Sequence, residues 1–119
     1  MDVRKGPGDR REGLFGGAGA VTVWNLLGRA AAPPFSAVLS CELEPGGSVG
    51  RHTQQEDPEI VLGLGGDGEA TVDGRAHDLG PGDVVYLAHG QVLSIANRSD
   101  VTPLYYLIIK ARDATSRGS

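Results

Sequence analysis

The chain has 119 residues, a length that suits one domain with a single hydrophobic core. Its net charge is −4 at pH 7 and no run of Lys and Arg marks a continuous face, which argues against nucleic acid or a membrane surface as a partner. The single Cys41 excludes an internal disulfide, and no apolar run resembles a signal peptide or a membrane span, so we expect a cytoplasmic protein.

The two ends of the chain are expected to be flexible. Residues 1–19 combine glycine, proline and charges of both signs, a composition typical of a mobile tail, in which Leu14 and Phe15 are the candidates for local order. Residues 113–119 form a polar tail at the other end. The folded domain is therefore expected to span residues 20–112.

Short extended segments separated by turns make up this domain. Strands are predicted at residues 20–27, 35–43, a short piece carrying His52 and Gln54, 59–64, 69–72, 75–79, 84–87, 92–97 and 103–110. Asp73-Gly74 predicts a two-residue hairpin, because both positions need a positive φ, and residues 65–68 are expected to form another hairpin turn. No convincing helical pattern is present, so the sequence predicts an all-β sandwich or barrel.

A glycine pattern at residues 63–68 literally matches the G-x-G-x-x-G signature of dinucleotide-binding proteins. That signature requires a helix directly after it, so that the helix N-terminus faces the pyrophosphate. Here a strand and another hairpin follow, and nucleotide binding is rejected.

Polar side chains converge around the turn at residues 55–58. Successive side chains of a strand point to opposite faces, so His52 and Gln54 share one face, as Glu59 and Val61 do on the next strand. If the two strands pair across this turn, an imidazole, an amide and a carboxylate meet on one side of a sheet. This convergence is the strongest chemical signal in the chain.

The spacing of these residues resembles the first motif of the cupin family. It runs Gly46, five residues, His52, one residue, Gln54, four residues, Glu59, six residues, Gly66, and only the family's second histidine departs, being Gln54. The family's second motif aligns with Gly82, Ala88-His89-Gly90, Leu93 and Asn97, where Leu93 stands in place of the histidine. The resemblance covers roughly residues 35–110.

This resemblance implies a double-stranded β-helix, that is, a small jelly-roll barrel with its site in the interior mouth. It also implies a homodimer, and the apolar closing strand at residues 103–110 is a candidate for cover by the partner. Metal-binding cupins use three His and one Glu to hold Fe, Mn, Ni, Zn or a similar ion.

Carried over residue by residue, the metal site is incomplete. His52 and Glu59 match the family's ligands, the amide of Gln54 is a weak donor, and Leu93 donates nothing. We therefore expect either no metal or a weakly bound divalent transition metal (Fe, Mn, Ni or Zn). His77 and His89 are expected at the surface or the rim of the barrel.

The remaining interior positions are apolar. Leu93 lies on the inward face, so the pocket is expected to carry few polar groups, and its residues are His52, Gln54, Glu59, Val61, Tyr86 and Leu93. Cys41 shares the more apolar face of strand 35–43 and is interpreted as a buried, unreactive thiol.

Three functions remain open at this level. The first is a small-molecule-binding cupin whose metal site is degenerate, with an organic molecule of unknown identity as its ligand. The second is a metal-dependent cupin enzyme of the dioxygenase, isomerase or polyketide-cyclase type. A buried His and carboxylate pair could also carry out acid–base chemistry without metal. The third is a structural or regulatory module whose barrel is filled by side chains.

Overall fold

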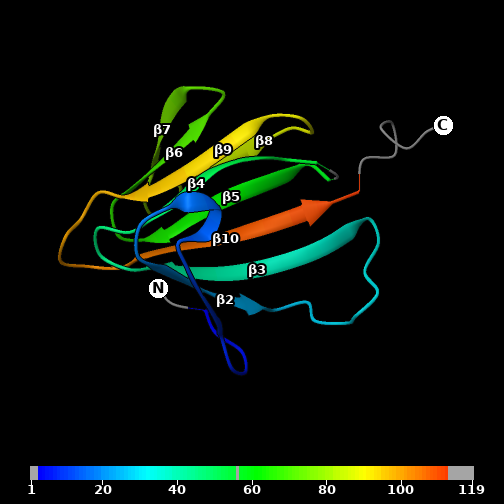
Figure 1. Cartoon of the computed structure of the whole chain (residues 1–119). Coiled ribbons are helices and arrows are strands. Elements are labelled where there is room, and N and C mark those ends of the chain that lie inside the picture. Colours follow the sequence, from blue (N-terminus) through cyan, green and yellow to red (C-terminus); the bar gives the residue numbers. More distant parts are fainter. Residues whose placement is uncertain (1–2, 56, 113–119) are drawn as a thin grey trace.

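A computed structural model describes residues 3–55 and 57–112 of the chain. Over these residues the chain forms ten β-strands and one short 3-10 helix, arranged as two facing sheets (Figure 1). The elements are β1 (Asp9–Glu12), η1 (Leu14–Gly16), β2 (Ala20–Asn25), β3 (Phe35–Leu43), β4 (Ser48–Thr53), β5 (Glu59–Gly65), β6 (Gly68–Val72), β7 (Arg75–Leu79), β8 (Val84–Leu87), β9 (Val92–Asn97) and β10 (Leu104–Ala111). The all-β jelly-roll architecture predicted from the sequence is confirmed.

Both sheets are antiparallel. The larger one has the strand order β1-β2-β3-β10-β5-β8, and the smaller one has the order β4-β9-β6-β7. Strands that follow one another in the chain often belong to opposite sheets, as in a jelly roll. The side chains of both inner faces meet in one core between the sheets.

This alternation between sheets corrects two predicted connections. β4 pairs with β9, whereas β5 pairs with β10 and β8, so the pairing expected across residues 55–58 is wrong. The turn at residues 65–68 likewise joins β5 to β6 in the other sheet and closes no hairpin. Each turn carries the chain from one layer to the other, which turn composition alone does not reveal. The Asp73-Gly74 hairpin between β6 and β7 is confirmed, with φ values of 49° and 81°.

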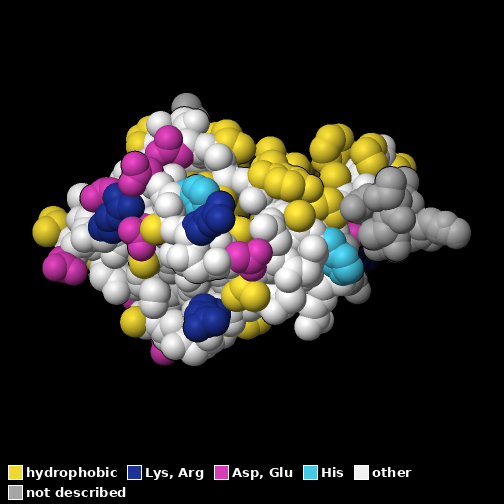
Figure 2. Space-filling view, turned by 90° about the horizontal axis from the view of Figure 1, so that it is seen from above, with side chains coloured by type: hydrophobic (Ala, Val, Ile, Leu, Met, Phe, Trp, Pro, Cys, Tyr) yellow, Lys and Arg dark blue, Asp and Glu magenta, His cyan; other side chains and the backbone are white. Residues whose placement is uncertain are grey.

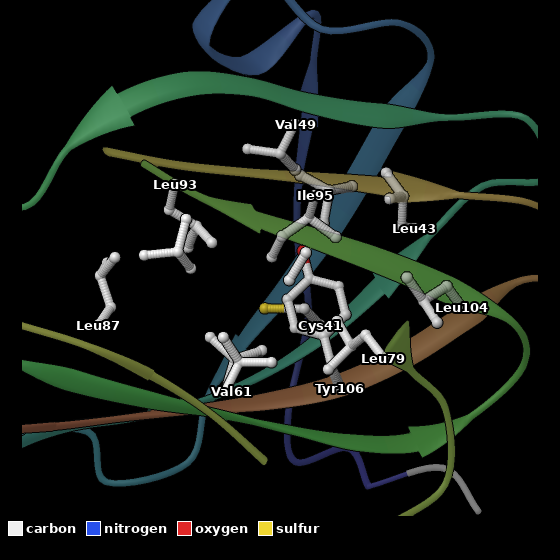
Figure 3. Close-up of a cluster of buried hydrophobic side chains, with 14 residues drawn as sticks. Cys41, Leu43, Val49, Val61, Leu79, Leu87, Leu93, Ile95, Leu104 and Tyr106 are labelled. Atoms are coloured by element: carbon white, nitrogen blue, oxygen red, sulfur yellow. The ribbon is translucent and has the colours of Figure 1, made fainter. Parts of the chain in front are cut away.

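The core is built from the inward positions of the strands. In β9 the buried residues alternate with half-buried ones, and Leu93, Ile95 and Asn97 all face inward as predicted. Figure 3 shows side chains from both sheets pointing toward one another, among them Leu93 and Ile95 from β9 and Val61 from β5. Burial of such aliphatic side chains contributes roughly 1.5–3 kcal/mol each relative to exposure, so this cluster is the main stabilising feature of the barrel.

The N-terminal segment is more regular than the predicted tail. β1 pairs with β2, and η1 follows directly, held by a hydrogen bond from the Gly13 amide to the Gly19 carbonyl at 2.9 Å. The turn uses left-handed backbone at Gly13 (φ 59°) and Gly16 (φ 81°), which glycine adopts without a Cβ penalty. The glycines that suggested flexibility are therefore the residues that allow these tight turns. The predicted C-terminal tail at residues 113–119 lies outside the described residues.

The surface carries charges of both signs. On the face shown in Figure 2, basic side chains lie singly or beside acidic ones, and hydrophobic side chains gather toward one end. Among the described residues, no helix has the length and apolar character needed to cross a bilayer.

Candidate functional site

A β-bulge in β4 directs His52 into the barrel. Val49 pairs with Ile95 and His52 pairs with Leu93, so three steps along β4 match two steps along β9. Without the extra residue, the two-residue period would place Val49 and His52 on opposite faces of the sheet. The bulge puts both on the inner face, and His52 lies directly opposite Leu93.

Two contacts hold the His52 ring. Its Nδ1 lies 3.1 Å from the carbonyl oxygen of Gly50. Because a carbonyl oxygen can only accept, Nδ1 carries a proton in this contact. The Phe15 ring stacks on the imidazole, with a centroid separation of 4.2 Å and an interplanar angle of 14°. These two contacts orient the His52 ring and leave Nε2 available to a ligand.

Glu59, the first residue of β5, is the buried ionisable group of the site. It is only 4% exposed, and its Oε2 has no hydrogen-bond partner among the described residues. Its Oε1 lies 3.9 Å from Nζ of Lys110, which is an ion pair without a hydrogen bond. Burial raises the pKa of Glu59, and the charge of Lys110 opposes this increase only in part. Burial therefore favours the neutral form of this carboxyl group, and Lys110 favours the charged form.

Gln54 has a structural role at the same end of the barrel. Its side-chain Nε2 donates to the carbonyl oxygen of Asp57, and its backbone amide donates to the carbonyl of Gln91 at 2.9 Å. The amide group thereby braces the turn between β4 and β5. This side-chain contact fits a residue that supports the turn.

The other predicted pocket residues divide between the interior and the surface. Leu93 is 1% exposed and lines the interior cavity. Val61 is fully buried in the core and is not among the residues that line this cavity. Tyr86 is 61% exposed, and its predicted place in the pocket is wrong. Alternation along β8 turns Val85 and Leu87 inward and leaves Tyr86 on the outer face of the larger sheet.

Two adjoining hollows occupy this end of the barrel. The inner one has a volume of about 160 Å³, and its walls are mostly apolar, with Glu59 and His52 among the few polar residues. The outer one has a volume of about 520 Å³ and is lined mainly by polar residues of the β4–β5 connection. Both are lined by Phe15, His52 and Lys110. These three side chains therefore form a neck between the two hollows.

The inner hollow is also lined by residues that were not predicted to line the pocket, among them Leu14, Phe15, Tyr106 and Lys110. Lys110 could have been found from parity, because it shares the inner face of β10 with Leu104 and Tyr106. No periodic pattern marks Leu14 or Phe15, which reach the hollow through a turn.

Cys41 is a buried thiol at the wall of the inner hollow, as predicted. Burial raises its pKa to about 12, with Tyr106 acting in the opposite direction through a hydrogen bond. At neutral pH the thiol is protonated and a poor nucleophile.

Asn97 fixes the far end of β9. Its Nδ2 lies 2.8–3.2 Å from three carbonyl oxygens, those of Leu43, Glu44 and Thr102. Its Oδ1 accepts from the backbone amide of Ser99 at 3.0 Å. The hydrogen bonds of this motif residue link the end of β9 to the end of β3, and Asn97 does not line either hollow.

The residues present do not fit a resident metal. Within residues 3–55 and 57–112, no group of three or more His, Cys, Asp or Glu side chains is placed to hold an ion. His52 and Glu59 remain as donors, and Leu93 lies opposite the imidazole. His77 and His89 are exposed as predicted, and Nε2 of His89 lies 2.7 Å from the Gln55 carbonyl oxygen at the rim. Two donors fall short of the three or four protein ligands that hold a transition metal firmly.

Comparison with known families agrees with the motif spacing. The cupin domain family matches residues 39–110. The chain belongs to the cupin family. The matched region contains His52, Glu59 and Lys110. Leu14 and Phe15, which also line the inner hollow of this cupin, lie outside the matched region. No curated protein matches the sequence.

Several solved structures are similar to this cupin. A Thermotoga maritima protein described as a predicted oxalate decarboxylase is 29% identical, with a TM-score of 0.84, covering 95% of this chain and 100% of that one. A cupin 2 conserved barrel domain protein from Salinispora arenicola is 23% identical, with a TM-score of 0.72, covering 99% and 98%. A cupin-superfamily sugar phosphate isomerase from Silicibacter pomeroyi is 26% identical, with a TM-score of 0.67, covering 78% and 60%.

Proposed function

We propose that this cupin binds a small, mainly apolar organic molecule in the inner hollow and holds metal weakly or not at all. The observation that carries the proposal is Glu59 Oε2, a buried oxygen without a hydrogen-bond partner among the described residues, in a mostly apolar hollow. An apolar cavity with a few placed polar groups is the usual form of a small-molecule site.

The size of the inner hollow limits the ligand. Its volume is about 160 Å³. An apolar protein cavity of about 150 Å³ accommodates benzene, whereas sites for larger ligands measure roughly 300–1,000 Å³. The part of the ligand that enters the inner hollow is therefore the size of a benzene ring or a short branched chain.

The polar groups of the inner hollow indicate which functional group the ligand carries. Leaving a buried acceptor without a donor costs about 1–3 kcal/mol, and a ligand hydroxyl on Glu59 would recover that free energy. The imidazole of His52 is a second polar group at the neck. A ligand with a hydroxyl group on an apolar body suits both groups.

Phenol and toluene test this proposal, because they share the ring and differ in the hydroxyl group. We expect wild-type protein to bind both in an NMR titration, and Glu59→Leu to weaken phenol roughly tenfold without weakening toluene. Leu93→Phe should weaken both by filling the hollow, while Glu69→Leu on β6 should change neither. Absence of binding by both probes, or unchanged binding in Leu93→Phe, would contradict the proposal.

Elemental analysis of freshly purified protein tests the metal content. We expect well under one transition metal per chain after dialysis. The double variant Gln54→His with Leu93→His should gain metal affinity by orders of magnitude, since Leu93 lies directly opposite His52. Near-stoichiometric Fe, Mn, Ni or Zn in the dialysed wild-type protein would refute a weak site.

The alternative is an enzyme of the metal-dependent cupin type, a dioxygenase, isomerase or polyketide cyclase. The similarity to the Thermotoga maritima protein and to the Silicibacter pomeroyi isomerase favours it. A second route is proton transfer by Glu59, a buried carboxyl group that lines the inner hollow together with His52 and whose pKa is raised by burial. Turnover of oxalate or a sugar phosphate, with and without added metal, that is lost in His52→Ala and Glu59→Ala would support an enzyme. Turnover that is equal in the variants would reject it.

A further inference from the structure

The neck between the two hollows carries a positive charge. Lys110 lies on the inner face of β10, shares that face with Tyr106, and lines both hollows. Its side chain is 35% exposed, so the ammonium group is partly removed from water. A cation in such a position interacts with a ligand more strongly than one on the open surface.

The hydrogen-bonding capacity of Lys110 is not used by the described protein groups. An ammonium group has three donors. Its nearest anionic partner is Oε1 of Glu59 at 3.9 Å, a distance too long for a hydrogen bond. Lys110 therefore offers donors to a ligand at the neck, a short distance from the acceptor that Glu59 Oε2 offers inside.

We propose that the ligand is a small hydroxy acid, with its apolar body in the inner hollow, its hydroxyl group on Glu59 and its carboxylate on Lys110. This inference rests on the proposed function and names the ligand class. Because Lys110 and Glu59 lie so close together, the hydroxyl and the carboxylate must be separated by only a few bonds. The apolar wall and the volume of the inner hollow limit the body of the ligand to an apolar group about the size of a benzene ring.

The charges around the neck are consistent with an anion there. Arg51 also lines the outer hollow and adds a second positive charge. Asp57 also lines the outer hollow, but its Oδ2 accepts from the Ser36 hydroxyl at 2.8 Å and the residue is buried. Glu59 would repel an anion only in its charged form, and burial favours its neutral form.

Three aromatic probes separate the two polar contacts. 3-Hydroxybenzoate carries both groups, 3-hydroxybenzyl alcohol lacks the charge, and benzoate lacks the hydroxyl. At pH 7.5 and low salt, we expect calorimetric titration of the full chain to give roughly tenfold tighter binding for 3-hydroxybenzoate than for either matched probe. The advantage over the alcohol should shrink in 200 mM NaCl, whereas binding of the alcohol should not change.

Variants assign each contact. Lys110→Met should abolish the advantage of 3-hydroxybenzoate over the alcohol, and Lys110→Arg should restore it. Glu59→Leu should abolish the advantage over benzoate. Lys5→Met changes the only other lysine of the chain, which is exposed and lies outside both hollows, and should have no effect.

The possible failures are distinguishable. If the acid and the alcohol bind equally well and phenol also binds, the inner hollow takes small molecules and the hydroxy-acid inference is wrong. If Lys110→Met weakens the alcohol as much as the acid, Lys110 supports the fold and the inference is also wrong. If no probe binds, phenol included, both proposals fail. The salt dependence of wild-type binding decides the question if the Lys110 variants do not fold.

Discussion

At the scale of single residues, Glu59 is a buried carboxyl group whose charge is sensitive to the fold. Burial opposes its ionisation, Lys110 favours it, and burial has the larger effect, so its pKa lies above the ordinary value of 4.5. The folded protein therefore binds the Glu59 proton more tightly than the unfolded chain does. By linkage, the stability of the fold decreases as pH rises from 4.5 through the raised pKa.

Replacement of Glu59 by Gln removes this pH dependence. We expect the melting temperature of Glu59→Gln, relative to wild type, to increase as the pH is raised from 4.5 toward 8, because only wild type acquires a buried charge. Thermal unfolding followed by circular dichroism at several pH values measures this difference. A difference that stays constant over the whole range would show that Glu59 is not perturbed by burial.

At the scale of elements, the N-terminal segment completes the site. η1 packs against β4 so closely that a Cβ on Gly50 would lie 1.9 Å from the Phe15 carbonyl oxygen, and Phe15 itself has left-handed backbone at φ 52°. A non-glycine residue in this conformation is uncommon and carries strain. The strained turn presents the Phe15 ring to His52 at the neck.

Phe15 should control passage through the neck. We expect Phe15→Ala to speed both association and dissociation of phenol, because the stacked ring is removed from the entrance while most of the inner wall remains. NMR line-shape analysis measures both rates. Phe35→Ala, which removes the other phenylalanine, 49% exposed on β3, is the matched control and should leave both rates unchanged. Equal rates in wild type and Phe15→Ala would mean that ligands enter elsewhere.

At the scale of the whole molecule, the outer face of the larger sheet is apolar across several strands. The pairing registers place Tyr86 beside Ile60, Ile60 beside Ile109, and Ile109 beside Val38. Val84 and Tyr86 on the edge strand β8 are 59% and 61% exposed. A contiguous exposed apolar face favours an interface. The homodimer expected from the family resemblance stays a prediction, and we propose that a second copy covers this face.

Size-exclusion chromatography with light scattering tests the dimer. We expect a dimer for wild type and a monomer for Tyr86→Glu, because a charge buried in an apolar interface is costly. Val101→Lys is the control, since Val101 is 83% exposed in a turn. A wild-type protein that stays monomeric at micromolar concentrations would refute this interface.

Local sequence patterns were sufficient to predict the positions of most of the strands. The predicted strand at residues 35–43 coincides with β3, and the Asp73-Gly74 hairpin forms as expected, because side-chain alternation and positive φ are properties of a few adjacent residues. Motif spacing also identified the family and two interior groups, His52 and Glu59. Tyr86 was misplaced because residues 84–87 are apolar at every position, so no polar alternation marks the inner face.

The sequence by itself thus determined the barrel, the Asp73-Gly74 hairpin and the positions, Gln54 and Leu93, at which the chain departs from the family's metal-binding motif. Only the tertiary structure decided that β4 and β5 face each other from opposite sheets, that a bulge returns His52 to the interior, and that Phe15 and Lys110 form the neck. The physical reason is that these features depend on contacts between residues far apart in the chain. Burial, which gives Glu59 its raised pKa, exists only once those distant strands have packed together.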